Sequence, residues 1–363
     1  MTTSTVPAKH HGLDHDRIRA EVDAVLSAYL GHKARTAAGQ GLPTEVTTVL
    51  GDFLAIGGKR IRPLLCVTGW HAAGGKNRPH ALVQAAASLE MFHAFCLIHD
   101  DVMDNSATRR GQPAVHRVLA SHHGQGRTTS AADRLGKSAA VLVGDLALAW
   151  SDELLHTAGL GTRRLTEVLP LIDAMRTEVM YGQYLDVTAA GTPTDDVERA
   201  LAICRYKTAK YTIERPLHIG AALAGAEQGL LDALTAFAIP LGEAFQLRDD
   251  LLGVFGDPRR TGKPTLDDLR DGKHTVLIAY AMRHATAARR QTLRTLLGNP
   301  HLDESAAVHL RRLLTDVGAP AAVEDMIRER LDTARHAMES GSIPADTAGL
   351  LLDLARQATA RTT

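Results

Sequence analysis

The sequence has few cysteines, few aromatic residues and no excess of charge of either sign. Three cysteines in 363 residues, all widely separated, are too few for a disulfide framework or a structural zinc site. Aromatic residues amount to only 4%, which is unlike a β-sandwich. Lysine plus arginine equals aspartate plus glutamate at 41 each, so no overall basic field favours binding to nucleic acid or to an anionic membrane.

Long hydrophobic runs without a polar or charged interruption are also missing. The longest apolar stretches contain Glu90 and His93 or Asp145, and we therefore expect no membrane-spanning helix and no stable membrane insertion. Residues 1–11 lack the hydrophobic segment of a secretory signal. These features together predict a cytoplasmic protein.

The remaining pattern is strongly helical. Hydrophobic residues make up 45% of the chain, which is enough for a sizeable core, and they recur mostly every three to four residues. We find neither a convincing alternating strand pattern nor a fixed-period repeat. The sequence predicts an all-α bundle, with a flexible tail at residues 1–14 and a single domain at 15–363. The expected helices include 111–121, 136–158 and 195–225.

Two aspartate clusters each follow a long apolar helical run. The first is DDVMD at residues 100–104, and the second is Asp249-Asp250. Residues four apart lie on the same helix face, so Asp100 and Asp104 are expected to be neighbours, with Asp101 beside them. Such carboxylates repel each other and need a positive partner when buried, for which Mg2+ is the natural candidate. A solvated acidic helix end is the alternative for either cluster taken alone.

Basic residues recur at several other places. The segment GGKRIRP at residues 57–63 sets three cations beside two glycines just before a helix, which suits an anion site, although a surface charge cluster is the alternative. Arg109 and Arg110 follow the first aspartate cluster, where they would either neutralise its carboxylates or bind a phosphate bidentately. The charged segment 257–273 suits either a solvated linker or a lid that carries phosphate-binding lysines.

Taken in order, these motifs resemble those of the trans-isoprenyl diphosphate synthases, the polyprenyl synthetase family, and in particular geranylgeranyl diphosphate synthases. The resemblance runs from about residue 50 to residue 277. The motifs that carry it are GGKRIRP at 57–63, HDDVMD at 99–104, RRG at 109–111, GQYLD at 182–186, Lys207-Thr208 and FQLRDD at 245–250.

The resemblance implies an all-α fold of antiparallel helices around a deep central cavity, usually in a homodimer. It implies a transferase that condenses an allylic diphosphate with isopentenyl diphosphate, using about three Mg2+ ions per active site. The implied metal ligands are Asp100, Asp104 and Asp249, with Asp101 and Asp250 in or beside the coordination sphere. The residues implied to hold the allylic diphosphate are Arg109, Lys207, Thr208, Gln246 and Lys263. The residues implied to hold isopentenyl diphosphate are Lys59, Arg62, His93 and Arg110. Lys273 matches a second lid lysine of the family.

One position departs from the family pattern. The second aspartate motif usually ends in a third aspartate, but this chain has Gly253 there. The missing carboxylate would stack over Asp249, so we expect weaker or altered metal binding rather than an inactive protein. Asp257, two helical turns beyond Asp250, is one candidate for compensation, and a partner-dependent non-catalytic subunit is an alternative.

Product length depends on the side chains upstream of Asp100. Phe95 is bulky and Cys96 is small, and the first motif carries no insertion, a pattern that resembles the geranylgeranyl-forming branch. We therefore expect a C20 product, with C15 as the alternative. A class I terpene cyclase would share the first motif, but would lack the segment at 57–63 and carry a different downstream metal motif. A plain helical metal-binding scaffold leaves the basic residues unexplained.

Overall fold

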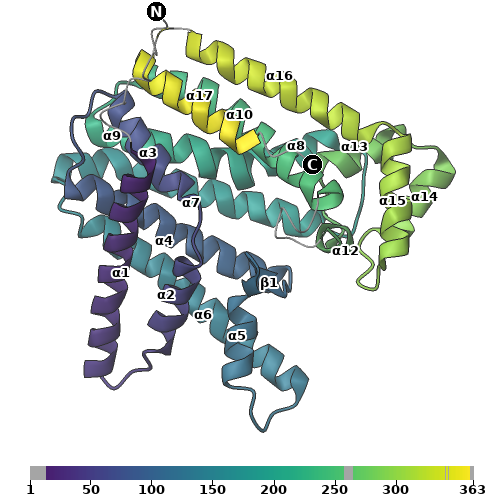
Figure 1. Cartoon of the computed structure of the whole chain (residues 1–363), viewed down its shortest axis with the longest axis horizontal. Helices are drawn as coiled ribbons and strands as arrows, with labels where there is room; N and C mark the ends of the chain where they lie inside the picture. The colour runs from purple at the N-terminus through teal and green to yellow at the C-terminus, as the bar shows by residue number, and fades with distance from the viewer. Residues whose placement is uncertain (1–13, 257–264, 340, 342, 360–363) are drawn as a thin grey trace, which may run out of the picture.

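The computed structural model describes residues 14–256, 265–339, 341 and 343–359, and it is almost entirely helical (Figure 1). The α-helices are α1 (His15–Gly39), α2 (Glu45–Ala55), α3 (Ile61–Ala72), α4 (His80–Met103), α5 (Val115–His122), α6 (Thr129–His156), α7 (Thr162–Ala189), α8 (Val197–Ile203), α9 (Arg215–Ala224), α10 (Gln228–Phe255), α12 (Asp267–Asp271), α13 (Val276–His284), α14 (Ala287–Leu296), α15 (Glu304–Asp316), α16 (Ala319–Glu339) and α17 (Ala345–Thr359). The all-α prediction is confirmed. The division into a tail and a single domain stays a prediction.

A short hairpin departs from the predicted helix at 111–121. Strands β1 (Thr108–Arg109) and β2 (Gln112–Pro113) pair in antiparallel register, and the turn between them uses positive φ angles at Arg110 (52°) and Gly111 (75°). An α-helix cannot continue through such angles, so α5 begins only at Val115. Two residues per strand are too few for an alternating pattern to be visible in the sequence.

Two further helices differ from their predicted bounds. Helix α6 begins at Thr129 rather than at 136, because Thr128 caps it by accepting a hydrogen bond from the backbone N–H of Ala131. The predicted helix 195–225 is divided, since a π-helix, η1 (Cys204–Glu214), lies between α8 and α9. A π-helix is rare as a rule and often marks a functional position.

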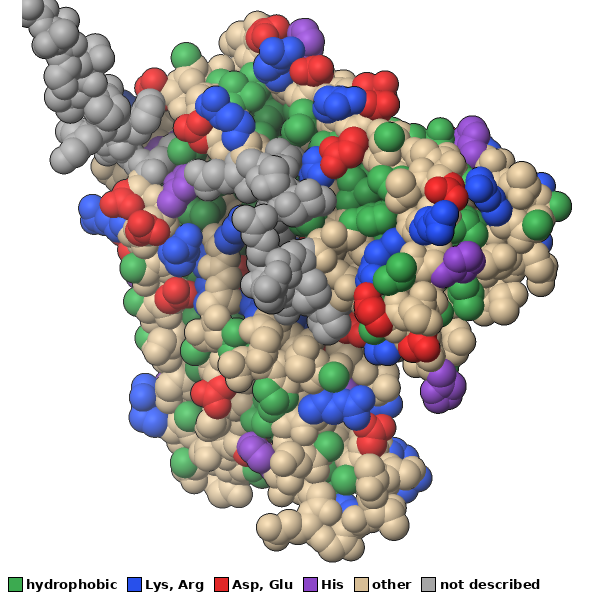
Figure 2. Space-filling model, turned by 45° about the vertical axis from the view of Figure 1, so that its right-hand side comes forward, with side chains coloured by type: hydrophobic (Ala, Val, Ile, Leu, Met, Phe, Trp, Pro, Cys, Tyr) green, Lys and Arg blue, Asp and Glu red, His purple; other side chains and the backbone are tan. Residues whose placement is uncertain are grey.

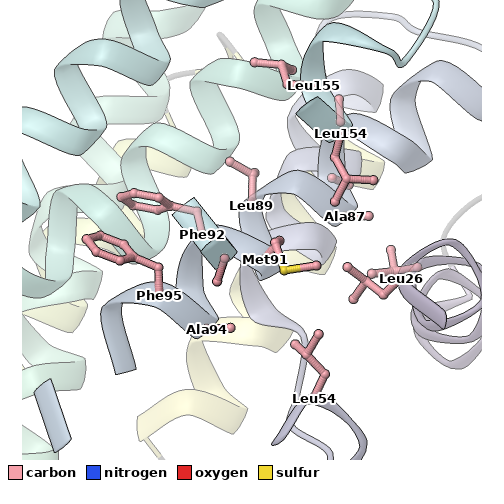
Figure 3. Packing of buried hydrophobic residues seen from close by; sticks show 14 of the residues in the cluster. Leu26, Leu54, Ala87, Leu89, Met91, Phe92, Ala94, Phe95, Leu154 and Leu155 are labelled. Carbon is pink, nitrogen blue, oxygen red and sulfur yellow. The ribbon is translucent and has the colours of Figure 1, made fainter. Parts of the chain in front are cut away.

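Helix α4 is the central helix of the largest hydrophobic cluster. Its side chains are buried on several faces, among them Leu89, Met91 and Phe92, as expected of a helix surrounded by others. Figure 3 shows Phe92 and Phe95 together on one side of α4, away from Leu26 of α1; their ring centroids are 5.4 Å apart. Helix α6 packs along α4, and this packing fixes the direction of the helix end that bears the first aspartate cluster.

Two glycines allow η1 to lie tightly between α7 and α10. A Cβ atom at Gly182 of α7 would lie 2.3 Å from the backbone nitrogen of Lys207, and one at Gly242 of α10 would lie 2.4 Å from Cα of Ala209. Any larger residue would push the helices apart. The close approach places the Lys207 segment of η1 between the ends of α4 and α10.

The C-terminal helices form a second layer over α10. Helices α13, α15 and α16 bury a separate hydrophobic cluster against it, and α16 runs along α10 (Figure 1). Helices α4 and α10 are long and apolar enough to cross a membrane by composition alone, but 67% of the relevant stretch of α4 is buried inside the fold. A buried core helix has the same composition, so this observation is weak evidence for a membrane span.

Candidate active site

The two aspartate clusters meet at one cavity of about 510 Å³. Asp100 and Asp104 come from the C-terminal end of α4, and Asp249 and Asp250 come from the C-terminal end of α10. A helix C-terminus carries partial negative charge, so carboxylates there are disfavoured unless cations face them. The geometry therefore requires positive charge in the space between the two helix ends.

Asp100 is the most heavily contacted carboxylate of the cavity. Its Oδ1 accepts hydrogen bonds from Lys207 Nζ (3.2 Å) and Gln183 Nε2 (3.1 Å), and its Oδ2 accepts one from Arg109 Nη2 (3.1 Å). Burial by itself raises the pKa of Asp100, but the charges of Lys207, Lys273 and Arg109 outweigh burial and hold that pKa well below its usual range. Asp100 is thus an anion at any physiological pH.

Asp104 and Asp101 have different surroundings. Asp104 lines the cavity, and its Oδ2 accepts a hydrogen bond of 2.6 Å from Lys273 Nζ. Asp101 is fully buried, lies outside the cavity wall and binds Arg109, whose Nε donates to its Oδ1 at 2.9 Å. Asp101 thus supports Arg109, and its expected place in or beside the metal coordination sphere stays a prediction.

The second acidic cluster is linked to η1 through a glutamine. Gln246 Nε2 donates to Asp250 Oδ1 at 2.7 Å, and Thr208 Oγ1 donates to Gln246 Oε1 at 2.6 Å. Burial, followed by the nearby carboxylates of Asp268 and Asp249, raises the pKa of Asp250 to about 8. The surroundings of Asp250 therefore favour its neutral form, in contrast to those of Asp100.

Several acidic residues of the cavity have no role in the sequence-based site. Asp186 of α7 accepts a 2.6 Å hydrogen bond from Lys207 Nζ, and Asp267, Asp268 and Asp271 of α12 also line the cavity. Asp186 could have been found from the sequence, because it is the last residue of the GQYLD motif. The α12 aspartates lie in the charged segment 257–273, in which only the lysines suggest phosphate binding.

The opposite side of the cavity is basic. Arg62 Nη2 donates to Thr212 Oγ1 at 2.6 Å, and the Arg62 guanidinium lies 4.1 Å from the centroid of the Tyr211 ring. His93 Nδ1 lies 2.8 Å from the Tyr211 hydroxyl, and burial, aided by Arg62, lowers the pKa of His93 well below its usual value. Sequence reasoning missed Tyr211 and Thr212, although each lies four residues after a member of the Lys207-Thr208 pair.

The basic segment 57–63 divides into two parts. Lys59 and Arg62 line the cavity together with Arg110, as the resemblance implies. Arg60 also lines the cavity, but it is only 5% exposed and makes a 2.8 Å ion pair with the buried Glu90, which favours a structural role. Arg110 Nη1 donates to the carbonyl oxygen of residue 57. The cations at positions 59, 60 and 62 therefore have different surroundings.

An apolar pocket of about 460 Å³ adjoins the cavity and shares Asp100 and Lys207 in its wall. Phe95 and Cys96 both line it, which places the two residues expected to limit product length beside the first aspartate cluster. Its rim includes Met180 and Tyr184, whose side chains are exposed on α7. A charged cavity joined to an apolar pocket suits a ligand with a polar head and a hydrocarbon tail.

The donor atoms of the charged cavity suit a hard divalent cation. Carboxylate oxygens from α4, α10 and α12 line one space, and oxygen is the donor that Mg2+ prefers. Within the described ranges, no three His, Cys, Asp or Glu side chains already stand in metal-binding geometry. The ammonium group of Lys273 lies beside Asp104. Lys263 and Asp257 lie outside the described residues.

Comparison with known proteins identifies the relatives of this chain. Residues 43–314 match the family profile described as Polyprenyl synthetase. The geranylfarnesyl diphosphate synthase of Aeropyrum pernix is 33% identical over 81% of this chain and 86% of its own length. A farnesyl diphosphate synthase of Mycobacterium tuberculosis is 34% identical over 64% of this chain and 59% of its own. The crystal structure of a geranylgeranyl pyrophosphate synthase from Corynebacterium glutamicum, complexed with isoprenyl diphosphate and magnesium, has a TM-score of 0.91 and 38% identity, with 96% of this chain and 100% of that one covered.

Proposed function

The chain belongs to the polyprenyl synthetase family and is a polyprenyl diphosphate synthase, and we propose that it is Mg2+-dependent and makes geranylgeranyl diphosphate. In this reaction isopentenyl diphosphate condenses with allylic diphosphates of C5 to C15. The observation that carries the proposal is the convergence of both acidic helix ends and the basic side chains on one cavity that adjoins an apolar pocket.

The charged residues would act on the allylic diphosphate. Its carbon–oxygen bond breaks heterolytically, and the electron pair leaves with the diphosphate, where negative charge increases. Arg109, Lys207 and Lys273 all lie where they can stabilise that charge more in the transition state than in the bound substrate. Mg2+, held by Asp100, Asp104 and Asp249, would supply further electrophilic stabilisation of the leaving group.

The basic wall would hold the second substrate. Lys59, Arg62 and Arg110 supply cations for the diphosphate of isopentenyl diphosphate, and Tyr211 and Thr212 fix the Arg62 side chain. The double bond then attacks the allylic cation to form the new carbon–carbon bond, and a proton leaves to the released diphosphate. The apolar pocket would shield the cation from water, which would otherwise trap it.

The pocket geometry supports a C20 product. The hydrocarbon tail would extend past Cys96, and the Phe95 ring would limit its length from the same helix. Relatives carry the names of C15, C20 and C25 synthases, so the family alone does not select the length. Farnesyl diphosphate is the second candidate product.

We expect a homodimer in the cytoplasm. Exposed apolar side chains lie on α6, on α7 and at the C-terminal end of α4, and such side chains favour an interface. They are Met103, Val141, Leu142, Leu146, Met180, Tyr181, Tyr184 and Val187. On the face in Figure 2 the two signs of charge are interspersed, which is in keeping with the expectation that nucleic acid is not a partner.

The test is an incubation of the purified chain with Mg2+, labelled isopentenyl diphosphate and each of the C5, C10 and C15 allylic diphosphates in turn. The expected result is a linear C20 diphosphate, formed only when Mg2+ is present. Asp100→Asn and Asp249→Asn are expected to abolish turnover while the far-ultraviolet circular dichroism stays helical. A cyclised hydrocarbon from one allylic substrate, or no turnover by a folded chain, would contradict the proposal.

A further inference from the structure

We propose that the ion pair between Arg176 of α7 and Asp152 of α6 forms a second, charged limit on the length of the product, beyond Phe95. This inference rests on the proposed function, because it concerns the hydrocarbon tail of the same product. Neither Arg176 nor Asp152 lines the charged cavity or the apolar pocket. The pair therefore lies outside the site described above, and it comes from two helices other than α4.

Helices α4 and α7 supply side chains to the apolar pocket in successive layers. At the acidic end of the pocket, Gln183 of α7 donates to the first aspartate cluster. One helical turn further along, Phe95 of α4 and Val179 of α7 both line the pocket. Residues three or four apart share a helix face, so the next layer consists of Phe92 on α4 and Arg176 on α7.

Phe92 contacts both Phe95 and Arg176. Its ring centroid lies 5.4 Å from that of Phe95, as Figure 3 shows for the two labelled rings, and 5.7 Å from the guanidinium carbon of Arg176. A guanidinium at this distance is attracted to an aromatic ring. A tail that extended past the position of Phe95 would therefore meet the Phe92 ring, which Arg176 holds in place.

Arg176 is in turn held by Asp152 and is unsuited to contact with hydrocarbon. Its Nη2 donates to Asp152 Oδ1. The Arg176 side chain is only 19% exposed, and its Nε atom is buried without a hydrogen-bond partner among the described residues. A tail pressed against this guanidinium would remove its remaining water and supply no new partner. The region beyond Phe92 therefore opposes a hydrocarbon chain by charge as well as by volume.

The two limits would act one after the other. While Phe95 is present, the tail does not reach Phe92, so the loss of Arg176 alone has no effect on product length. When Phe95 is replaced by alanine, the tail grows until it meets Phe92 and Arg176. Only the loss of both Phe95 and Arg176 would allow still longer products. This dependence of one substitution on another is what a double-mutant cycle measures.

The experiment compares the unaltered chain with Arg176→Met, Phe95→Ala and Phe95→Ala/Arg176→Met. Methionine removes the charge but fills similar space with a flexible apolar side chain. Products are read by chromatography of the dephosphorylated alcohols. Arg176→Met is expected to keep the product length of the unaltered chain. The double variant should raise the ratio of longer to shorter products roughly tenfold over Phe95→Ala, since more of the chain is buried in apolar surroundings.

Two matched variants test whether the charge at this position is the cause. Phe95→Ala/Arg176→Lys retains a cation and should give the products of Phe95→Ala. Phe95→Ala/Arg163→Met removes an exposed arginine that pairs with Glu167 at the start of α7, and it should also give those products. Circular dichroism and Tm identify any variant that fails to fold. Phe95→Ala/Arg176→Gln, which also lacks the charge, then replaces the methionine variant.

A second measurement needs no turnover. Calorimetry in the presence of Mg2+ measures the binding of linear C15 and C25 n-alkyl diphosphates to each variant. Phe95→Ala/Arg176→Met is expected to bind the C25 compound roughly tenfold more tightly than Phe95→Ala does, and the C15 compound equally well. A chain without prenyl transfer would refute the proposed function, whereas the alkyl chains would still report on Arg176.

Three results would overturn the inference. The first is equal C25 affinity, or an equal product distribution, for Phe95→Ala and Phe95→Ala/Arg176→Met. The second is a longer product from Arg176→Met while Phe95 is in place. The third is lengthening by Phe95→Ala/Arg176→Lys, which would show that the cation is not the limiting group.

Discussion

Lys207 lies between two carboxylates from different helices. Its Nζ donates to Asp100 Oδ1 at 3.2 Å and to Asp186 Oδ2 at 2.6 Å, and so joins the ends of α4 and α7 through η1. Burial lowers the pKa of Lys207, but Asp100 and Asp186 more than reverse this effect, and the pKa is raised overall. The ammonium group is therefore a permanent cation in the cavity wall.

Replacing Lys207 is expected to remove a major source of leaving-group stabilisation. Lys207→Met should lower kcat about 10²- to 10³-fold, a loss typical of one electrostatic group in an active site. Lys210→Met is the matched control, since Lys210 lies on the same helix but pairs with Glu178 and Glu214. Single-turnover kinetics of both variants would check the expectation. Equal losses of kcat in the two variants would show that the effect is not specific to the position of Lys207.

Replacing Gly182 even by alanine is expected to lower the activity. Gly182→Ala adds a methyl group 2.3 Å from the backbone nitrogen of Lys207, so η1 must move and carry Lys207 away from Asp100. A shift of about 1 Å can cost a 10²-fold loss of rate. Gly229→Ala at the start of α10 meets no atom within 4 Å and is the control. The kcat of Gly229→Ala should be unchanged. Measuring kcat and Tm for both variants tests whether the loss is specific to Gly182.

Product length should respond to Phe95. Phe95→Ala opens the apolar pocket beyond Cys96, and the expected product is longer than that of the unaltered chain. The product distribution is read by chromatography of the dephosphorylated alcohols. Phe237→Leu changes a fully buried ring that lies outside both cavity walls, so it controls for loss of stability alone. An unchanged product from Phe95→Ala would remove the structural basis for the C20 assignment.

Stability should fall in mild acid because of His116. This side chain is 1% exposed, and burial, together with Arg117 and Lys137, lowers its pKa to about 4. The folded state therefore holds the neutral imidazole, while the unfolded chain binds a proton below about pH 6.5. Protonation favours unfolding, so the stabilisation present above pH 6.5 is lost progressively as the pH falls toward 4.

The expected loss is about 2 kcal/mol between pH 7 and pH 5. Urea unfolding at the two pH values measures it, and His116→Gln should remove most of the difference. His309→Gln at an exposed position of α15 is the control and should retain the pH dependence of the unaltered chain. A His116→Gln variant with an undiminished pH dependence would show that other groups cause it.

The sequence was sufficient for the fold class and for the convergence of the two acidic clusters. Helical periodicity is local information, and the spacing of Asp100 and Asp104 fixes their common face without any tertiary knowledge. The ion pair between Arg60 and Glu90 could not be predicted from the sequence. Only the fold brings Glu90 within 2.8 Å of its guanidinium, and a cation beside two other cations in the sequence gives no sign of such a partner.

The close packing of the π-helix was equally hidden. It lies against Gly182 of α7 and Gly242 of α10, and both are contacts between separate elements. Local propensity and spacing carry no information about them, because a glycine in a helix has the same sequence signature whether or not another segment approaches it.

The β1–β2 hairpin has a consequence for how far apart the two substrates would sit. Arg109 reaches the carboxylates of Asp100 and Asp101, whereas the next residue, Arg110, reaches the carbonyl oxygen of Gly57 beside the basic wall. Two consecutive residues, with Cα atoms about 3.8 Å apart, therefore send their side chains to the acidic cluster and to the basic segment. The contacts of the two arginines would then depend on their being consecutive, and inserting a single residue between them would separate the acidic contact from the basic one.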